Sequence, residues 1–101
     1  MFNKENRYIT KGINEVLDIR LQIFLWRAID NLKDKVEKVD YLQVFEIEKN
    51  YGTMTIKHRQ EVPEYKEEYI IELCDIDVSR KIKVFVIDDG DYSTMLLAEE
   101  Y

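Results

Sequence analysis

This chain of 101 residues is 46% hydrophobic and carries a formal net charge of −6. The length allows one compact core and is too short for two, so we expect a single domain over residues 1–101. Seven Tyr, four Phe and one Trp, against only three Gly and one Pro, exclude an intrinsically disordered chain. The acidic balance argues against direct binding of DNA or RNA, which requires a basic patch.

The first predicted elements are a brief strand and a long helix. The strand covers residues 7–10, after which Gly12 marks the way into the next element. The helix runs from Asp18 to about Lys38, because apolar residues recur there at i, i+3, i+4 and i+7. Asp18 is the predicted N-cap, since its carboxylate can accept from the free amides of the first turn. The apolar residues of this core-facing stripe are Leu21, Phe24, Leu25, Ala28, Ile29, Leu32 and Val36.

Three large apolar residues of the same helix lie off this stripe. At about 100° per residue, Ile19, Ile23 and Trp26 fall on the far side of the helix. One interpretation is that a loop or the N-terminal strand covers them. The other is that they form an exposed surface for a partner or a second copy of the chain, because Trp is enriched at binding hot spots.

After the helix, the apolar pattern changes to period two, which is typical of strands. The predicted strands are 41–49, 53–60, 69–73, 81–87 and 92–97. Turns at 50–52 and 88–91 join neighbouring strands as hairpins, and Pro63 interrupts the ladder before the short edge strand. These elements predict an α+β fold, with one mostly antiparallel sheet of about five strands and one long amphipathic helix packed on a face.

Acidic residues are concentrated in the second half of the chain. Residues 1–45 carry seven acidic against eight basic side chains, whereas residues 46–101 carry fourteen against seven. A region of one charge sign steers association with a basic partner, although it can also be a solvated edge that discourages aggregation. Two tyrosines among the carboxylates would add aromatic contact area. The predicted partner-binding surface comprises Glu61, Glu64, Tyr65, Glu67, Glu68, Tyr69, Glu72, Asp75, Asp77, Asp88, Asp89 and Asp91.

No residue pattern indicates a metal or a cofactor. Oxygen ligands gather on the turn that contains Asp88, Asp89, Asp91 and Ser93, but their spacing does not match a calcium-binding loop. The chain also lacks a phosphate-binding glycine-rich loop and zinc-ligand spacing. We therefore expect no metal and no cofactor.

His58 is the one candidate for catalysis. A histidine base would need a nucleophile and an orienting carboxylate, for which Cys74 with Glu72 or Asp75 are the available residues. Yet the predicted strand alternation turns His58 inward, and acidic neighbours raise the pKa of a thiol such as that of Cys74. We therefore expect a protein that is not an enzyme.

The cysteine count and the hydropathy pattern indicate a compartment. A single cysteine cannot form an internal disulfide, and no secretory leader is visible at the N-terminus. No apolar run approaches the roughly 20 residues of a membrane span. We expect a cytoplasmic protein without membrane contact.

Several runs of the chain resemble a known family. They are RYITKGI at 7–13, LQIFLW at 21–26, DYLQVF at 40–45, HRQE at 58–61, VIDDG at 86–90 and YSTMLL at 92–97. These runs are similar to the domain-of-unknown-function family 960, small proteins of Gram-positive bacteria, their phages and plasmids. The resemblance covers nearly the whole chain but brings no assigned catalytic residue. It implies an accessory gene on a mobile element, a setting in which small acidic proteins often inhibit host defences. The resemblance also implies that members similar to this chain include inhibitors of type II-A CRISPR effectors.

These observations lead to three hypotheses of function. The first is a non-enzymatic inhibitor whose acidic surface binds a basic protein, such as a Cas9-type nuclease or its guide complex, and blocks guide loading or DNA access. The second is an accessory protein of unknown role that forms a homodimer through Ile19, Ile23 and Trp26 and has an unrelated partner. The third is a hydrolase or nuclease that uses His58.

Overall fold

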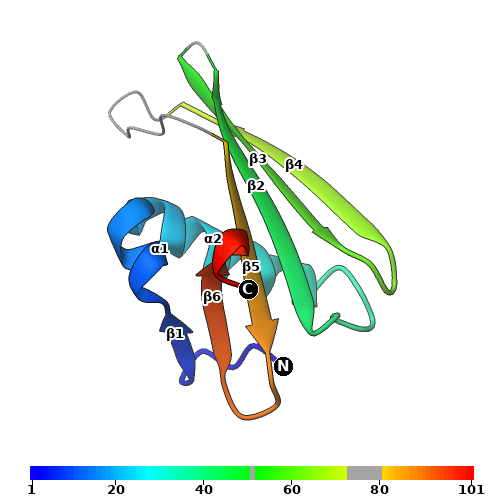
Figure 1. The fold of residues 1–101 in the computed structure, drawn as a ribbon. Coiled ribbons are helices and arrows are strands. Elements are labelled where there is room, and N and C mark those ends of the chain that lie inside the picture. The colour runs from blue at the N-terminus through cyan, green and yellow to red at the C-terminus, as the bar shows by residue number, and fades with distance from the viewer. Residues whose placement is uncertain (51, 73–80) are drawn as a thin grey trace.

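The computed structural model describes residues 1–50, 52–72 and 81–101. In this part of the chain, six strands form one sheet in the order β1-β6-β5-β2-β3-β4 (Figure 1). The elements in chain order are β1 (Arg7–Ile9), α1 (Lys11–Val16), α2 (Ile19–Lys33), β2 (Leu42–Asn50), β3 (Thr53–Gln60), β4 (Tyr65–Ile71), β5 (Ile82–Asp88), β6 (Ser93–Leu97) and the short 3-10 helix η1 (Ala98–Glu100).

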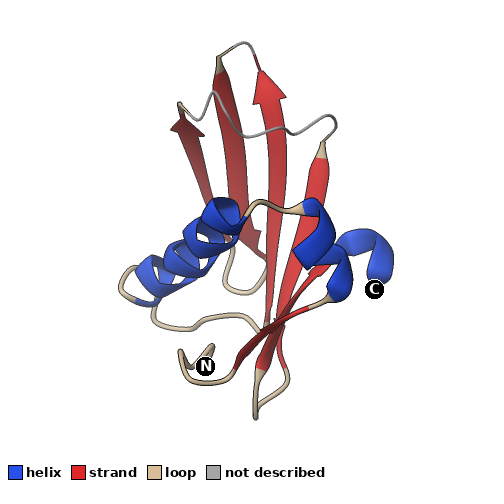
Figure 2. Cartoon of the chain, turned by 90° about the vertical axis from the view of Figure 1, so that its left-hand side faces the viewer, coloured by secondary structure: helices blue, strands red, loops and turns tan. Residues whose placement is uncertain are grey.

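Helix α2 and the 3-10 helix η1 lie on opposite sides of this sheet (Figure 2). We call the sheet face toward α2 the inner face and the opposite one the outer face. The alternation of side chains along each strand and the register between strands assign each residue to one of these two faces. Phe45 of β2 lies opposite Val84 and His58 on the inner face. The next residue along β2, Glu46, lies opposite Lys57 and Lys83 on the outer face.

The predicted architecture is wrong in three respects, and only the coarser α+β class is confirmed. The sheet has six strands rather than about five. Its edge strand β1 runs parallel to β6, with Arg7 opposite Ser93, so the sheet is mixed. Two short helices replace one long one. The parallel pair escaped prediction because it joins the first strand to the last, and local turn signals do not encode such a distant pairing.

Helix α1 is not among the predicted elements, because a glycine such as Gly12 near its start is typical of a break between elements. Thr10 caps this helix, since its side-chain oxygen accepts a hydrogen bond from the amide of Ile13. Gly12 allows close packing instead: a Cβ at this position would lie 2.6 Å from the carboxylate of Glu100 and would displace it. That carboxylate in turn accepts a hydrogen bond from the Thr10 hydroxyl at 2.7 Å. The C-terminal turn therefore holds the start of α1 in place.

Helix α2 confirms the predicted cap and most of the predicted stripe. The side chain of Asp18 accepts from the amide of Arg20, as an N-cap should. The helix ends at Lys33 rather than at about Lys38, so Val36 lies beyond it. Its buried residues are Leu21, Gln22, Leu25, Ala28, Ile29 and Leu32.

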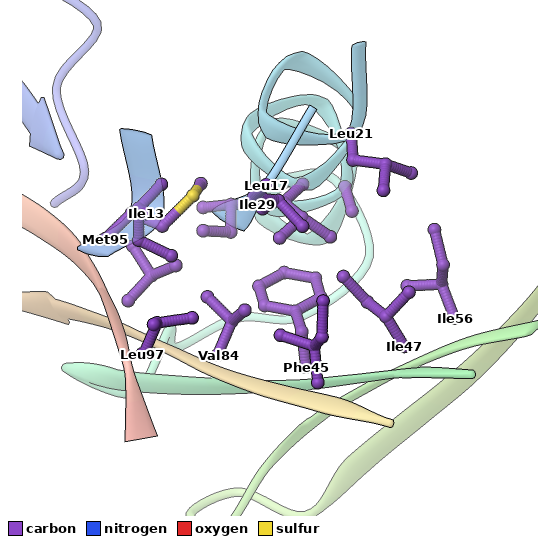
Figure 3. Packing of buried hydrophobic residues seen from close by; sticks show 14 of the residues in the cluster. Ile13, Leu17, Leu21, Ile29, Phe45, Ile47, Ile56, Val84, Met95 and Leu97 are labelled. Carbon is purple, nitrogen blue, oxygen red and sulfur yellow. The ribbon is translucent and has the colours of Figure 1, made fainter. Parts of the chain in front are cut away.

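The core lies between the helices and the inner face (Figure 3). Leu21 and Ile29 of α2 point toward Phe45 and Ile47 of β2, and all four side chains are fully buried. Each such side chain contributes roughly 1.5 to 3 kcal/mol by leaving water. Phe2, in a segment that the sequence marks as polar, is also fully buried and belongs to this core.

The predicted strands agree with the structure to within one residue, except at β4. Strand β3 matches its predicted range of 53–60, and Tyr51 of the predicted turn lies outside the described residues. Strand β4 is an edge strand, as predicted, but it begins at Tyr65 rather than at residue 69. The run of charged residues after Tyr65 concealed this start, because charged side chains on an edge strand resemble a loop.

Candidate functional site

The far side of α2 carries the predicted apolar residues Ile19, Ile23 and Trp26, which we call the α2 strip. Ile19 and Ile23 are 62% and 47% exposed. Trp26 is only partly buried and packs against the core. The Arg7 guanidinium lies 4.8 Å from the centroid of the Trp26 ring, a cation–π distance. The strip is therefore covered at its Trp26 end and open at its Ile19 end.

The cover over Trp26 comes from the N-terminal strand. Arg7 faces α2 from β1, where it forms an ion pair with Asp30 and donates to the backbone oxygen of Phe2 at 2.8 Å. Lys33 donates to the same oxygen at 2.9 Å. These contacts hold the N-terminal segment along the C-terminal half of α2. They leave the first two turns of the helix, and with them Ile19 and Ile23, without such a cover.

Strand alternation divides the predicted acidic surface between the two faces of the sheet. Tyr65, Glu67 and Tyr69 lie on the inner face of β4, since their partners on β3 belong to that face. Glu68 lies on the outer face opposite Lys57. The neighbouring residues Glu61, Glu64 and Glu72 are exposed, whereas Asp75 and Asp77 lie outside the described residues.

Basic side chains accompany several of these carboxylates. The ion pairs are Arg59–Glu61 at 3.9 Å, Lys66–Glu64 at 3.7 Å and Lys35–Glu67 at 3.8 Å. Such exposed pairs add about 0 to 1 kcal/mol of stability, but they reduce the negative field around the segment. Lys35 lies far from Glu67 in the chain, in the segment that follows α2, so the local sequence did not reveal this pair.

The turn carboxylates have structural roles. Asp88 accepts from the amides of Phe2 and Gly90. Asp89 accepts from the amides of Tyr92 and Asp91, and these backbone hydrogen bonds, that of Tyr92 above all, lower the pKa of its carboxyl below the usual range. Asp91 is exposed. The carboxylates of Asp88 and Asp89 therefore shape the hairpin turn.

His58 belongs to a buried polar network. It is 1% exposed, and its ring stacks on Phe45 with 4.3 Å between the centroids. Its Nε2 lies 2.7 Å from Oε1 of Gln43, which can only accept, so Nε2 carries the proton. Burial lowers the pKa of His58 to about 4, which keeps the ring neutral near pH 7.

The hydrogen bonds of Gln43 and Gln60 in this network connect two loops to the sheet. Nε2 of Gln43 donates to Oε1 of Gln60 at 2.9 Å. Gln60 accepts from the amide of Asp40 at 2.9 Å and donates to the backbone oxygen of Pro63 at 2.8 Å. These bonds join the α2–β2 loop and the β3–β4 turn. Because His58 is enclosed and holds this network, its position favours a structural role over catalysis.

The outer face of β2, β3 and β4 contains an open hollow of about 450 Å³. The sequence pattern did not indicate it. Its lining residues are Glu46, Lys57, His58, Arg59, Lys66, Glu67 and Glu68. The strand register places the side chains of His58 and Glu67 on the inner face, so the other five side chains surround the hollow on the outer face. Within the described ranges, no group of three or more His, Cys, Asp or Glu residues is placed to hold a metal ion. Neither helix there combines the length and apolarity that a membrane crossing requires.

Comparison with known proteins gives a family and a related fold. The model of a staphylococcal protein family of unknown function, DUF960, matches residues 6–100. A crystal structure of a protein of unknown function from Enterococcus faecalis is similar, with a TM-score of 0.77 and 27% identity over 99% of this chain and 94% of that one. No curated protein matches the chain.

Proposed function

Because this chain belongs to the DUF960 family, whose description names no activity, we propose its function from its surfaces: it is a non-enzymatic protein that binds a protein partner through the α2 strip. The exposure of Ile19 and Ile23 carries this proposal. The opposite side of α2 already buries its own apolar stripe, so folding does not require these two side chains. Large apolar groups on a polar helix face are typical of contact surfaces.

The charges beside the strip favour a particular kind of partner. Arg27, next to Trp26, is exposed and forms no ion pair with any residue that the structure describes. Arg and Trp together are enriched at the centres of interfaces. We therefore propose a partner with an apolar patch bordered by carboxylates. A second copy fits less well, because a twofold contact pairs a patch with itself and brings like charges together.

The test removes the exposed side chains and leaves the helix intact. The variant combines Ile19→Ser with Ile23→Ser, and the control is Asn31→Ser, at an exposed position of the same helix. A partner recovered from a host lysate is purified, and its affinity is measured for each protein. We expect about a tenfold or greater loss for the double variant and none for the control.

Two outcomes would contradict this proposal. Equal affinity of the partner for the wild type and both variants would show that the strip does not contact it. A dimeric wild type that the double variant converts to a monomer, measured by light scattering, would instead assign the strip to a second copy.

A second candidate function rests on charge. Fourteen of the 21 acidic residues lie in residues 46–101, and the net charge is −6. We propose as this alternative that the protein binds a basic surface, such as that of a Cas9-type nuclease, and blocks guide loading or DNA access.

In a test of this alternative, an excess of the purified protein should inhibit cleavage of target DNA by the nuclease. Changing Glu61, Glu64 and Glu68 together to Gln should slow association most at low salt. Full cleavage in the presence of wild-type protein would contradict this candidate.

A further inference from the structure

Three cations meet at the hollow on the outer face, in a protein that is acidic as a whole. Arg59 of β3 and Lys66 of β4 are direct cross-strand partners. Lys57 lies two residues before Arg59 and therefore on the same face. All three line the hollow of about 450 Å³. Like charges directly opposite one another destabilise a strand pair, so this arrangement has a cost that folding alone does not explain.

The carboxylates that pair with Arg59 and Lys66 are exposed to solvent. Arg59 and Lys66 lie 3.9 and 3.7 Å from Glu61 and Glu64, whose side chains are 71% and 75% exposed. Ion pairs at this distance between solvated groups are weak, so a ligand can compete with Glu61 and Glu64 for the two cations.

Lys57 has no ion pair with any residue in the described ranges, although Glu46 and Glu68 flank it across the strands. Glu46 instead approaches Lys81 at 3.6 Å. The ammonium group of Lys57 is therefore available to an anion that enters the hollow.

We propose that this hollow binds a phosphorylated small molecule, with its phosphate group between Arg59 and Lys66 and with Lys57 as a third contact. A guanidinium group matches phosphate oxygens in a bidentate manner, and lysine adds a compact charge. The volume falls within the roughly 300 to 1,000 Å³ of small-molecule sites, so the ligand extends beyond the phosphate. Glu46 and Glu68 line the same hollow and can accept from hydroxyl groups of that remainder.

The carboxylates of Glu46 and Glu68 argue against a long polyanion, such as a nucleic acid, as the ligand of the hollow. A nucleic acid strand crossing the outer face would meet Glu46 and Glu68 next to the cations, and the protein carries a net charge of −6. One phosphate group on a hydroxyl-bearing molecule avoids this repulsion.

The test compares inorganic phosphate, glucose 6-phosphate and glucose as probes of the full chain. Binding is followed by NMR, through the amide signals of β3 and β4, and by calorimetry. We expect saturable binding of both phosphate probes, tighter for glucose 6-phosphate, and none for glucose. Arg59→Gln and Lys66→Gln should each weaken binding about tenfold, as loss of a charge-assisted hydrogen bond does.

Lys11→Gln is the matched control, because it removes one positive charge from α1, where Lys11 is 89% exposed. It should change the affinity by less than about twofold. Thermal melts must show that Arg59→Gln and Lys66→Gln remain folded; each should be as stable as the wild type or more so, since a like-charge pair is removed. Absence of saturable binding, or equal weakening by Lys11→Gln, would overturn the proposal.

Discussion

The two sides of α2 contain similar residues in very different surroundings. Leu21 and Leu25 are fully buried, whereas Ile19 and Ile23 are 62% and 47% exposed, although all four belong to the same 15-residue helix. Apolar character alone therefore does not show what a residue does. The buried side of α2 stabilises the fold. The exposed apolar residues on the other side do not have this role, and binding of a partner would explain them.

The largest loss of stability is expected from a substitution on the buried side of α2. Leu25→Ala should reduce the free energy of unfolding by about 2 to 5 kcal/mol, because the surrounding core cannot fully close the cavity. Ile23→Ala, half a turn away, should cost less than about 0.5 kcal/mol. Denaturant unfolding of both variants tests this difference, and equal losses would show that the exposed side also supports the fold.

The folding stability should depend on pH because of His58, which is buried in the interior beneath α2. The pKa of His58 is about 4 in the folded protein, below the unfolded value near 6.5. Stability from this group is thus fully present above about pH 6.5 and is lost as the pH falls toward 4, by about 3 kcal/mol in total. Urea unfolding between pH 7 and pH 4 measures it.

The control for this prediction is His58→Gln, which removes the titrating ring. The variant should be less stable at neutral pH, but its unfolding free energy should fall less steeply between pH 6.5 and pH 4. Ile23→Ser should retain the wild-type slope. An identical slope in wild type and His58→Gln would show that His58 does not titrate on unfolding as described.

Trp26 should give an intermediate effect, because it lies between the two sides. Trp26→Ala should cost about 1 to 2 kcal/mol, since the ring is only partly buried. Part of this loss belongs to the contact with Arg7. A double-mutant cycle with Arg7→Gln should give a coupling energy of about 0.5 to 2 kcal/mol. Additive losses would mean that Arg7 does not hold Trp26.

Local signals were sufficient to predict α2 and most strands. The period of α2 identified its buried stripe, and the Asp18 carboxylate identified its first turn. Alternation around Met54 and Ile56 gave the bounds of β3 and the inward position of His58. In each case the signal lies within the element itself.

Features that depend on distant residues escaped prediction. The parallel contact of β1 with β6 and the burial of Phe2 both need the C-terminal hairpin. The acidic segment appeared to be a field of one sign because Lys35, the partner of Glu67, lies far earlier in the chain, just after α2. The pair Arg59 and Lys66 requires the register between β3 and β4, which an edge strand of charged residues conceals.

Ile23→Ser tests the central claim, that the exposed side of α2 serves binding rather than folding, most directly. Its unfolding free energy and its affinity for the purified partner are measured on the same preparation. The account predicts stability within about 0.5 kcal/mol of the wild type and a binding loss of about 1 kcal/mol or more. A loss of about 2 kcal/mol in stability with unchanged binding would contradict it, because Ile23 would then contribute to the fold and not to a partner surface.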